Sequence, residues 1–138
     1  MVLWRVYIMN YNYTLVLDGV PTHILEATDT IYSKHPLFAY MSILVAVYNV
    51  SIGKYEDMRL EGHIPTKSTP EESKPFEEKK VLSVNGSDPM GIYEATDVLC
   101  TECSTIDYLN VLNNVRNVVK GNCSKYRTGG NVVSLVRV

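Results

Sequence analysis

The feature that most constrains the fold of this chain is a stretch of sequence that occurs twice. ILEATD at residues 24–29 returns as IYEATD at residues 92–97. The same shift of 68 residues, without a gap, pairs identical residues downstream: Tyr40, Leu44, Val47, Asn49, Val50 and Gly53 match Tyr108, Leu112, Val115, Asn117, Val118 and Gly121. A register kept over about thirty residues indicates an internal duplication. The sequence therefore predicts two similar structural units.

Each predicted unit opens with a strand and a tight turn. LVLDG at 15–19 and VLSVNG at 81–86 place Asp-Gly or Asn-Gly directly after a β-branched run, which is typical of a hairpin turn. In the next segment, PTHILEATDTIY, the apolar residues Ile24, Ala27 and Ile31 stand three and four apart. This spacing favours a helix with Pro21 in its first turn, and a second hairpin strand is the alternative.

A second helix follows in each unit. Residues 104–121 carry one apolar face formed by Tyr108, Val111, Leu112, Val115 and Val118. Ser104 with Asp107 predicts the helix start, and Gly121 suits a left-handed helix end. The equivalent helix at 37–52 is apolar nearly all round, with Val45, Ala46 and Tyr48 where the second copy has Asn113, Asn114 and Arg116. We expect the first of these helices to be buried or to pack in an oligomer interface.

Strand-like stretches follow each second helix, at 54–64 and at 125–138, where Gly129-Gly130 predicts a hairpin turn. Between them, residues 65–80 read PTKSTPEESKPFEEKK, a composition typical of a linker. The predicted organisation is unit 1 at 1–64, a linker at 65–80 and unit 2 at 81–138. Residues expected in or beside the core are Trp4, Val6, Ile8, Val133, Leu135 and Val138.

These elements predict an α+β fold. With 138 residues and 46% hydrophobic residues, the chain is large enough to form one compact domain. We expect two strand-helix-helix-strand repeats related by a pseudo-two-fold axis, with the helices on one face of a mainly antiparallel sheet that both repeats share.

The repeat also duplicates a pair of carboxylates. Glu26 and Asp29 stand three residues apart, as do Glu94 and Asp97, so each pair shares one face of a helix. Four carboxylates gathered by a two-fold axis would offer the oxygen ligands that Mg²⁺ and Mn²⁺ prefer, which predicts metal-assisted phosphodiester hydrolysis. The simpler interpretation is that acidic residues early in a helix offset its dipole.

A second candidate site contains cysteine. Cys100 and Cys103 form a C-x-x-C pair, and Cys123 follows. These three thiolates with a histidine such as His35 would complete a tetrahedral zinc site. The alternative is that the cysteines are ordinary core residues, since the chain has no second C-x-x-C.

The third candidate is a basic surface near the C-terminus. From Tyr108 onward the sequence contains no acidic residue. The residues predicted to bind nucleic acid are Arg116, Lys120, Lys125, Tyr126 and Arg127, with the cations on phosphates and the Tyr126 ring stacked on a base. The alternative is an ordinary solvated face that pairs with acidic residues of unit 1.

Charge, apolar runs and cysteine content bear on which partners the protein binds and in which compartment it functions. The net charge of -2 provides no global field that would attract nucleic acid or an anionic membrane. The longest apolar run, residues 37–50, is too short to cross a bilayer, and the N-terminal residues lack a signal-peptide pattern. Three cysteines suit reduced thiols, so we expect an intracellular, cytoplasmic protein without a membrane partner.

The leading functional prediction is a small non-catalytic binding or assembly protein that acts through its two-repeat domain, on a protein partner or by self-association. The sequence contains no phosphate-binding glycine loop, dinucleotide-binding glycine motif, G-x-S-x-G or H-E-x-x-H, so catalysis lacks the common signatures. The alternatives are a nucleic-acid-binding protein and a divalent-metal nuclease or phosphodiesterase. We expect no cofactor under the leading prediction, Mg²⁺ or Mn²⁺ for the nuclease, and Zn²⁺ if the cysteines bind metal.

Overall fold

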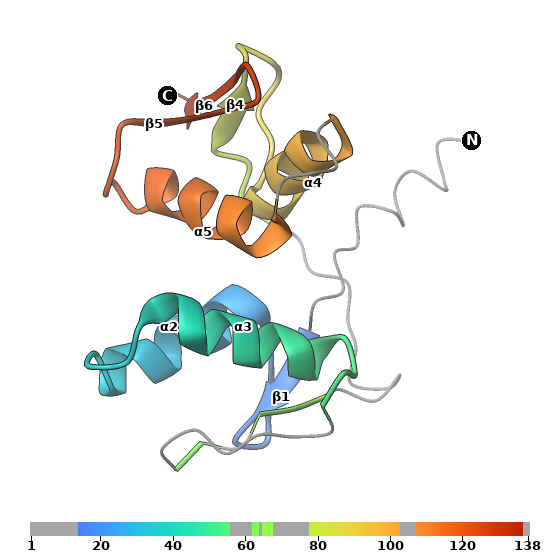
Figure 1. Cartoon of the computed structure of the whole chain (residues 1–138), viewed down its shortest axis with the longest axis vertical. Helices are drawn as coiled ribbons and strands as arrows, with labels where there is room; N and C mark the ends of the chain where they lie inside the picture. Colours follow the sequence, from blue (N-terminus) through green and yellow to red (C-terminus); the bar gives the residue numbers. More distant parts are fainter. Residues whose placement is uncertain (1–13, 56–61, 64, 68–77, 103–106, 137–138) are drawn as a thin grey trace. The chain divides into compact units, whose positions relative to one another are not determined.

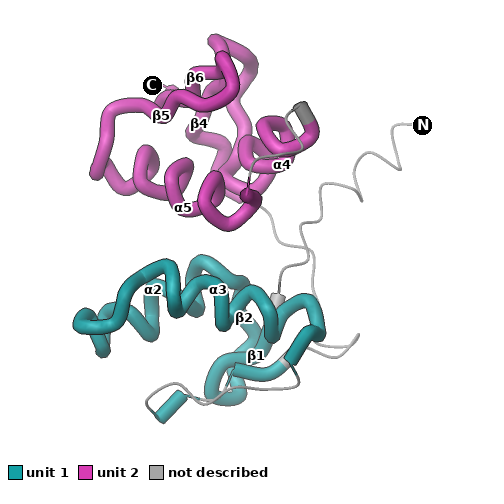
Figure 2. The backbone as a smooth tube through the Cα atoms, in the orientation of Figure 1, with its two compact units in different colours: residues 1–76 teal, residues 77–138 magenta. Residues whose placement is uncertain are grey.

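The computed structural model describes residues 14–55, 62–63, 65–67, 78–102 and 107–136. The chain divides into two compact units, residues 1–76 and 77–138 (Figure 2). In each unit, two described helices accompany a three-stranded antiparallel sheet, so the predicted α+β class is confirmed (Figure 1). One detail differs from the prediction, because the described strands form two separate sheets instead of one shared sheet.

Unit 1 consists of a small sheet and a helical hairpin. Strands β1 (Thr14–Leu17), β2 (Val20–His23) and β3 (Pro65–Lys67) are arranged in the order β2-β1-β3. Helices α2 (Ile24–Lys34) and α3 (Tyr40–Ser51) pack on each other, and both contact β1. Residues 65–67 were predicted as linker, but they pair with β1 and so belong to the sheet.

The segment that begins at Pro21 contains both of the predicted alternatives. Asp18 and Gly19, with φ of 52° and 85°, form the predicted turn, and Val20–His23 returns as the second hairpin strand. The helix then begins at Ile24, so Pro21 lies in β2 and not in the first turn of the helix. An edge strand tolerates proline because its outward side needs no N–H donor.

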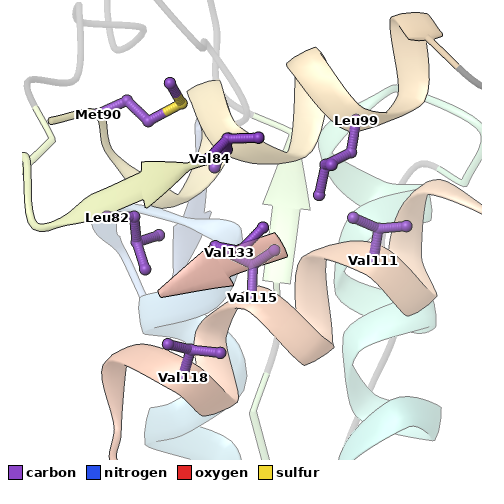
Figure 3. Packing of buried hydrophobic residues seen from close by; sticks show 9 residues of the cluster. Leu82, Val84, Met90, Leu99, Val111, Val115, Val118 and Val133 are labelled. Carbon is purple, nitrogen blue, oxygen red and sulfur yellow. The ribbon is translucent and has the colours of Figure 1, made fainter. Parts of the chain in front are cut away.

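Unit 2 is built from β4 (Leu82–Val84), α4 (Ile92–Glu102), α5 (Tyr108–Val119), β5 (Lys125–Thr128) and β6 (Asn131–Leu135), with the strands in the order β4-β6-β5. The predicted turn between the last two strands is confirmed, with positive φ at Gly129 and Gly130. Figure 3 shows Leu82, Val84 and Val133 of the sheet packed together with Val111, Val115 and Val118 of α5 and with Leu99 of α4.

The elements of the two units correspond closely. Residues 24–34 and 40–51 of unit 1 become 92–102 and 108–119 of unit 2, so both pairs of helices keep the shift of 68 residues. The strand pairing agrees as well: Leu15 pairs with Lys67 in unit 1, and Leu82 pairs with Leu135 in unit 2. The first strand is shifted by 67 residues instead of 68, because the second copy has one extra residue before Pro89. The pseudo-two-fold relation between the units stays a prediction.

Some sequence expectations need correction, and others lie outside the described residues. Asp107 is the N-cap residue of α5, and its carboxylate accepts a hydrogen bond from the backbone N–H of Leu109 at 3.1 Å. Ser104, the predicted start of this helix, lies outside the described residues, as do Trp4, Val6, Ile8 and Val138. Val133 is fully buried as expected, but Leu135 is 44% exposed because it ends the sheet instead of filling the core.

The unit 1 core is tested by Leu44→Ala. Leu44 is completely buried on α3, so truncation should lower the free energy of unfolding by about 2 to 5 kcal/mol through lost burial and a residual cavity. Urea denaturation measures this loss. Ser42→Ala on the same helix is the control, since Ser42 is exposed and lies outside the core. A change of less than about half a kcal/mol for Leu44→Ala would contradict the central position of α3.

Candidate functional site

The repeated E-A-T-D residues lie on the first helix of each unit. The alanines and threonines of both copies, Ala27, Thr28, Ala95 and Thr96, are fully buried. Each threonine hydroxyl donates to the carbonyl oxygen four residues earlier, at 2.6 Å from Thr28 to Ile24 and at 2.8 Å from Thr96 to Ile92. The buried hydroxyls are therefore satisfied within their own helices.

The repeated aspartate connects the two helices of its unit. In unit 1 the hydroxyl of Tyr40, the first residue of α3, donates to Oδ1 of Asp29 at 2.7 Å. In unit 2 the side chain of Tyr108, the first residue of α5, interacts with Asp97 and lowers its pKa. The Ala, Thr and Asp residues of the repeated motif thus have a packing role.

The repeated glutamates differ between the units. Glu26 is exposed and accepts the hydroxyl of Thr22 at 2.8 Å, while Nε2 of His23 lies 3.5 Å from the same oxygen. Burial lowers the pKa of His23, and the nearby carboxylates of Glu26 and Asp29 oppose this shift. Glu94 is half-buried, and its backbone N–H donates a hydrogen bond to the carboxylate of Glu78.

The four carboxylates predicted as a catalytic metal site are divided between the units, with Glu26 and Asp29 on α2 and Glu94 and Asp97 on α4. Their convergence stays a prediction. No group of three or more His, Cys, Asp or Glu side chains within the described residues has an arrangement that could hold a metal ion.

One carboxylate that the sequence did not single out, Glu78, binds the start of α4. Its oxygens accept the backbone N–H groups of Tyr93 at 2.7 Å and Glu94 at 3.1 Å. A side chain at Gly91 would come within 2.5 Å of Glu78, so glycine gives the carboxylate its space. The sequence analysis placed Glu78 in the linker. One signal could have indicated that a distant carboxylate caps α4: the helix begins after a glycine, without Ser, Thr, Asp or Asn at its cap position.

Glu78, Glu94 and Asp97 form an acidic cluster around the first two turns of α4. Burial raises the pKa of Glu78 to about 7, the two backbone N–H groups act in the opposite direction, and Glu94 and Asp97 add repulsion. Burial also raises the pKa of Asp97 to about 6; the Tyr108 side chain opposes this shift and repulsion from Glu94 adds to it. Both groups therefore hold a proton more readily in the folded protein than in the unfolded chain.

The residues predicted to bind zinc come from both units. Cys100 is half-buried and packs against the unit 2 core, whereas Cys123 is exposed and Cys103 lies outside the described residues. The zinc site of these cysteines and His35 stays a prediction. His35 ends α2 in unit 1, where its ring contacts Phe38 and His63 with centroids 5.9 and 5.6 Å away.

His63 also takes part in a contact that the sequence did not predict. Its Nδ1 lies 2.8 Å from Oδ2 of Asp18, so it connects the β1-β2 turn to the chain just before β3. The matching residues of unit 2, Asn85 and Asn131, are joined at 2.7 Å. Because two amides make the same connection, the contact of His63 has a structural explanation.

Helix α3 carries apolar residues on the side away from its core contacts. Met41, Val45, Tyr48 and Ile52 follow one another at intervals of four, three and four residues, and we call them the outer stripe. Met41 and Tyr48 are half-exposed, while Val45 and Ile52 are 39% and 46% exposed. Residues at this spacing lie along one face of a helix. Leu37 and Phe38, just before α3, are also exposed.

The predicted basic residues lie at the C-terminal end of α5 and on β5. Lys120, Lys125 and Arg127 are exposed, and Arg116 is half-buried. Tyr126 instead packs against the core of unit 2, so its ring is only partly open to a stacking base.

The bond between the helices of unit 1 is tested by Tyr40→Phe. This change removes the hydroxyl that binds Asp29 and keeps the ring, which packs edge-on against Tyr32. We expect the free energy of unfolding in urea to fall by about 1 to 3 kcal/mol, as for other hydrogen bonds to a charged group. Tyr55→Phe, at an exposed position, is the control. Equal stability of both variants would contradict the role of Tyr40.

The acidic cluster predicts a dependence of stability on pH. The pKa values of Glu78 and Asp97 are raised in the folded state, from 4.5 to about 7 and from 3.8 to about 6. Through these two carboxyls the folded protein binds more protons than the unfolded chain between about pH 4 and 7, so their contribution to stability falls as the pH rises through that range. We expect a higher Tm at pH 5 than at pH 7.5.

Glu78→Gln should make this dependence shallower, because the amide keeps an acceptor and carries no charge. Thermal unfolding at both pH values measures the effect, and Asp88→Asn, at an exposed carboxylate, is the control. The assignment is wrong if the difference in Tm between the natural protein and Glu78→Gln is the same at pH 5 and pH 7.5.

Comparisons with known proteins add no functional assignment. No protein-family model, no curated protein and no solved structure matches this chain. The interpretation of these surfaces therefore rests on the contacts, burial and charges within the chain itself.

Proposed function

We propose that the protein is a small non-catalytic assembly protein that self-associates through the outer stripe of α3. The observation that supports this proposal is that α3 is apolar on two sides, one that faces the core and one that faces away from it. Residues facing the core include Ile43, Val47 and Val50, which are 2% exposed or less. The outer stripe adds Met41, Val45, Tyr48 and Ile52. A helix that is apolar on both sides is typical of one packed between two partners.

Unit 2 supports the view that the outer stripe is not needed for folding. The equivalent positions on and after α5 are Leu109, Asn113, Arg116 and Lys120, three of them polar. This helix packs on α4 and on its sheet as α3 does on α2 and on its sheet. The fold therefore tolerates polar side chains at these positions. Apolar residues at the same positions of unit 1 call for another explanation, and exposed apolar patches commonly mark protein contacts.

A second copy of this chain suits the stripe as the partner. From Pro36 to Gly53 the sequence contains no charged residue. A two-fold axis puts the same patch on both sides of the contact, so a patch with charges of one sign would repel its copy, whereas an uncharged apolar patch is self-complementary. The spacing of four, three and four residues also matches the seam along which two helices pack. The packing role of the repeated Ala, Thr and Asp residues supports the non-catalytic part of the proposal.

The proposal predicts a dimer that Val45→Asn with Ile52→Lys dissociates. Both replacements are residues that unit 2 carries at the equivalent positions, so the fold should persist. Light scattering coupled to size exclusion, over about a hundredfold range of concentration, measures the mass. We expect the natural protein to shift from monomer to dimer as its concentration rises and the variant to remain a monomer.

Circular dichroism verifies that the variant remains folded, and Lys34→Asn with Lys54→Ala, at exposed positions of unit 1, is the surface control. A natural protein that stays monomeric throughout would refute self-association; the stripe would then be covered by another part of this chain or by a different protein. A dimer that persists in the folded variant would show that association uses another surface.

A further inference from the structure

We infer that the open edge of β5 binds an extended segment of another protein, which adds a strand to the sheet of unit 2 and carries acidic residues at alternate positions. This inference gives the protein a second contact surface with a different kind of partner, and it does not depend on self-association through α3. It rests on the strand register, on the backbone groups at the two edges of the sheet and on the side chains of β5.

The backbone groups of Lys125 and Arg127 face the open edge of the sheet. Among the described strands β5 lies at this edge, and its neighbour β6 places Ser134 opposite Lys125 and Val132 opposite Arg127. Val132 turns its backbone toward β4, because its carbonyl oxygen accepts the N–H of Asn85 and its N–H donates to Oδ1 of Asn85, both at 2.8 Å. Backbone direction alternates along a strand, so Ser134 faces β4 as well. The N–H and C=O groups of Lys125 and Arg127 therefore point away from β6.

The fold closes the other edge of the same sheet, which is formed by β4. Leu82 exchanges two backbone hydrogen bonds with Met90, at 2.9 and 2.7 Å. The carbonyl oxygen of Val84 accepts the backbone N–H of Ser87 at 3.0 Å, and the N–H of Val84 donates to Oγ of Ser87 at 3.1 Å. Within the described residues, no such partner reaches the outward groups of β5. Unit 2 thus satisfies one edge of its sheet and leaves the other one ready to pair with an added strand.

The side chains of β5 indicate which residues the added strand carries. Lys125 and Arg127 are exposed, whereas Tyr126 between them packs against the core. The two cations therefore share the outer face of the sheet, about 7 Å apart. Among the described residues neither cation forms an ion pair. Side chains directly opposite each other on paired strands interact, so acidic residues two positions apart would meet the cations, and an apolar residue between them would lie beside Tyr126.

The open backbone groups favour a protein segment over nucleic acid. The edge of β5 offers carbonyl oxygens as well as N–H groups, and phosphate oxygens can only accept hydrogen bonds. A phosphate backbone would therefore leave the carbonyl oxygens of this edge without donors. An extended peptide supplies both donors and acceptors, so main-chain hydrogen bonds give affinity and alternate side chains give specificity.

Charge also favours a different protein over a second copy of this chain. Two β5 strands that paired edge to edge about a two-fold axis would bring lysine and arginine opposite lysine and arginine. Like charges directly opposite each other destabilise a strand pair. Lys125 and Arg127 thus oppose pairing of the edge with itself, while the same cations attract a strand of opposite charge.

The test is fluorescence anisotropy with the full chain and a labelled peptide in which Glu alternates with Val or Thr. A peptide of the same composition with its Glu residues in one block is the control probe, and we expect it to bind more weakly. Only alternate residues of a strand present their N–H groups to a given neighbour. N-methylation of one alternate set of peptide residues should therefore abolish binding, and N-methylation of the other set should preserve it.

Variants of Lys125 separate the backbone from the charge. Lys125→Pro removes an outward N–H at the first residue of β5, a position where an edge strand tolerates proline. Lys125→Gln removes the same charge and keeps the N–H, so it is the matched control. We expect Lys125→Pro to bind the alternating peptide about fivefold more weakly than Lys125→Gln, as for the loss of one backbone hydrogen bond. Circular dichroism verifies that both variants remain folded.

Other outcomes would overturn the inference. Equal binding of the alternating and block peptides, or equal effects of both N-methylated sets, would show that charge alone attracts the peptide. Tighter binding of a labelled DNA oligonucleotide would assign the cations to phosphates, and no binding of the alternating peptide at low salt would remove the function. Val45→Asn with Ile52→Lys separates this result from self-association, because that variant should bind the peptide as the natural protein does.

Discussion

The contact between the two helices of each unit is the interaction on which the rest of the structure depends. Each unit is small, so its sheet alone has too little apolar surface to form a core. Completely buried Leu44 and Leu112 come from the second helices, and buried alanine and threonine on the first helices contribute to both cores. The hydrogen bond from Tyr40 to Asp29 connects the helices of unit 1 where the second one begins, and Tyr108 interacts with Asp97 at the equivalent place in unit 2.

This shared core leaves the outer sides of the second helices open to change. The outer stripe on α3 and the basic residues on α5 occupy equivalent positions, and neither set supplies the main core contacts. One scaffold can therefore carry two different surfaces, apolar in unit 1 and positively charged in unit 2. The contact of His63 with Asp18, replaced by two asparagines in unit 2, illustrates the same freedom at the sheet.

Much of the fold was predictable from local patterns. Turns at Asp18-Gly19 and Gly129-Gly130 follow from residues that accept positive φ, and α5 follows from the spacing of Val111, Leu112, Val115 and Val118. Other features depend on distant partners. The carboxylate of Glu78 looked like part of a charged linker until the fold brought it to the start of α4. Tyr126 looked like a stacking ring because its sequence neighbours are polar, but β5 directs it to the core.

The sequence by itself determined the duplication, the α+β class and the positions of the helices, because repeats, apolar spacing and turn residues are local properties of the chain. The tertiary structure determined the roles of the repeated residues. Ala, Thr and Asp of E-A-T-D acquire their roles only when a second helix supplies Tyr40 or Tyr108 and closes the core over them. It also decided that the described strands form two sheets, since strand pairing depends on which segments meet in space and not on the pattern within either one.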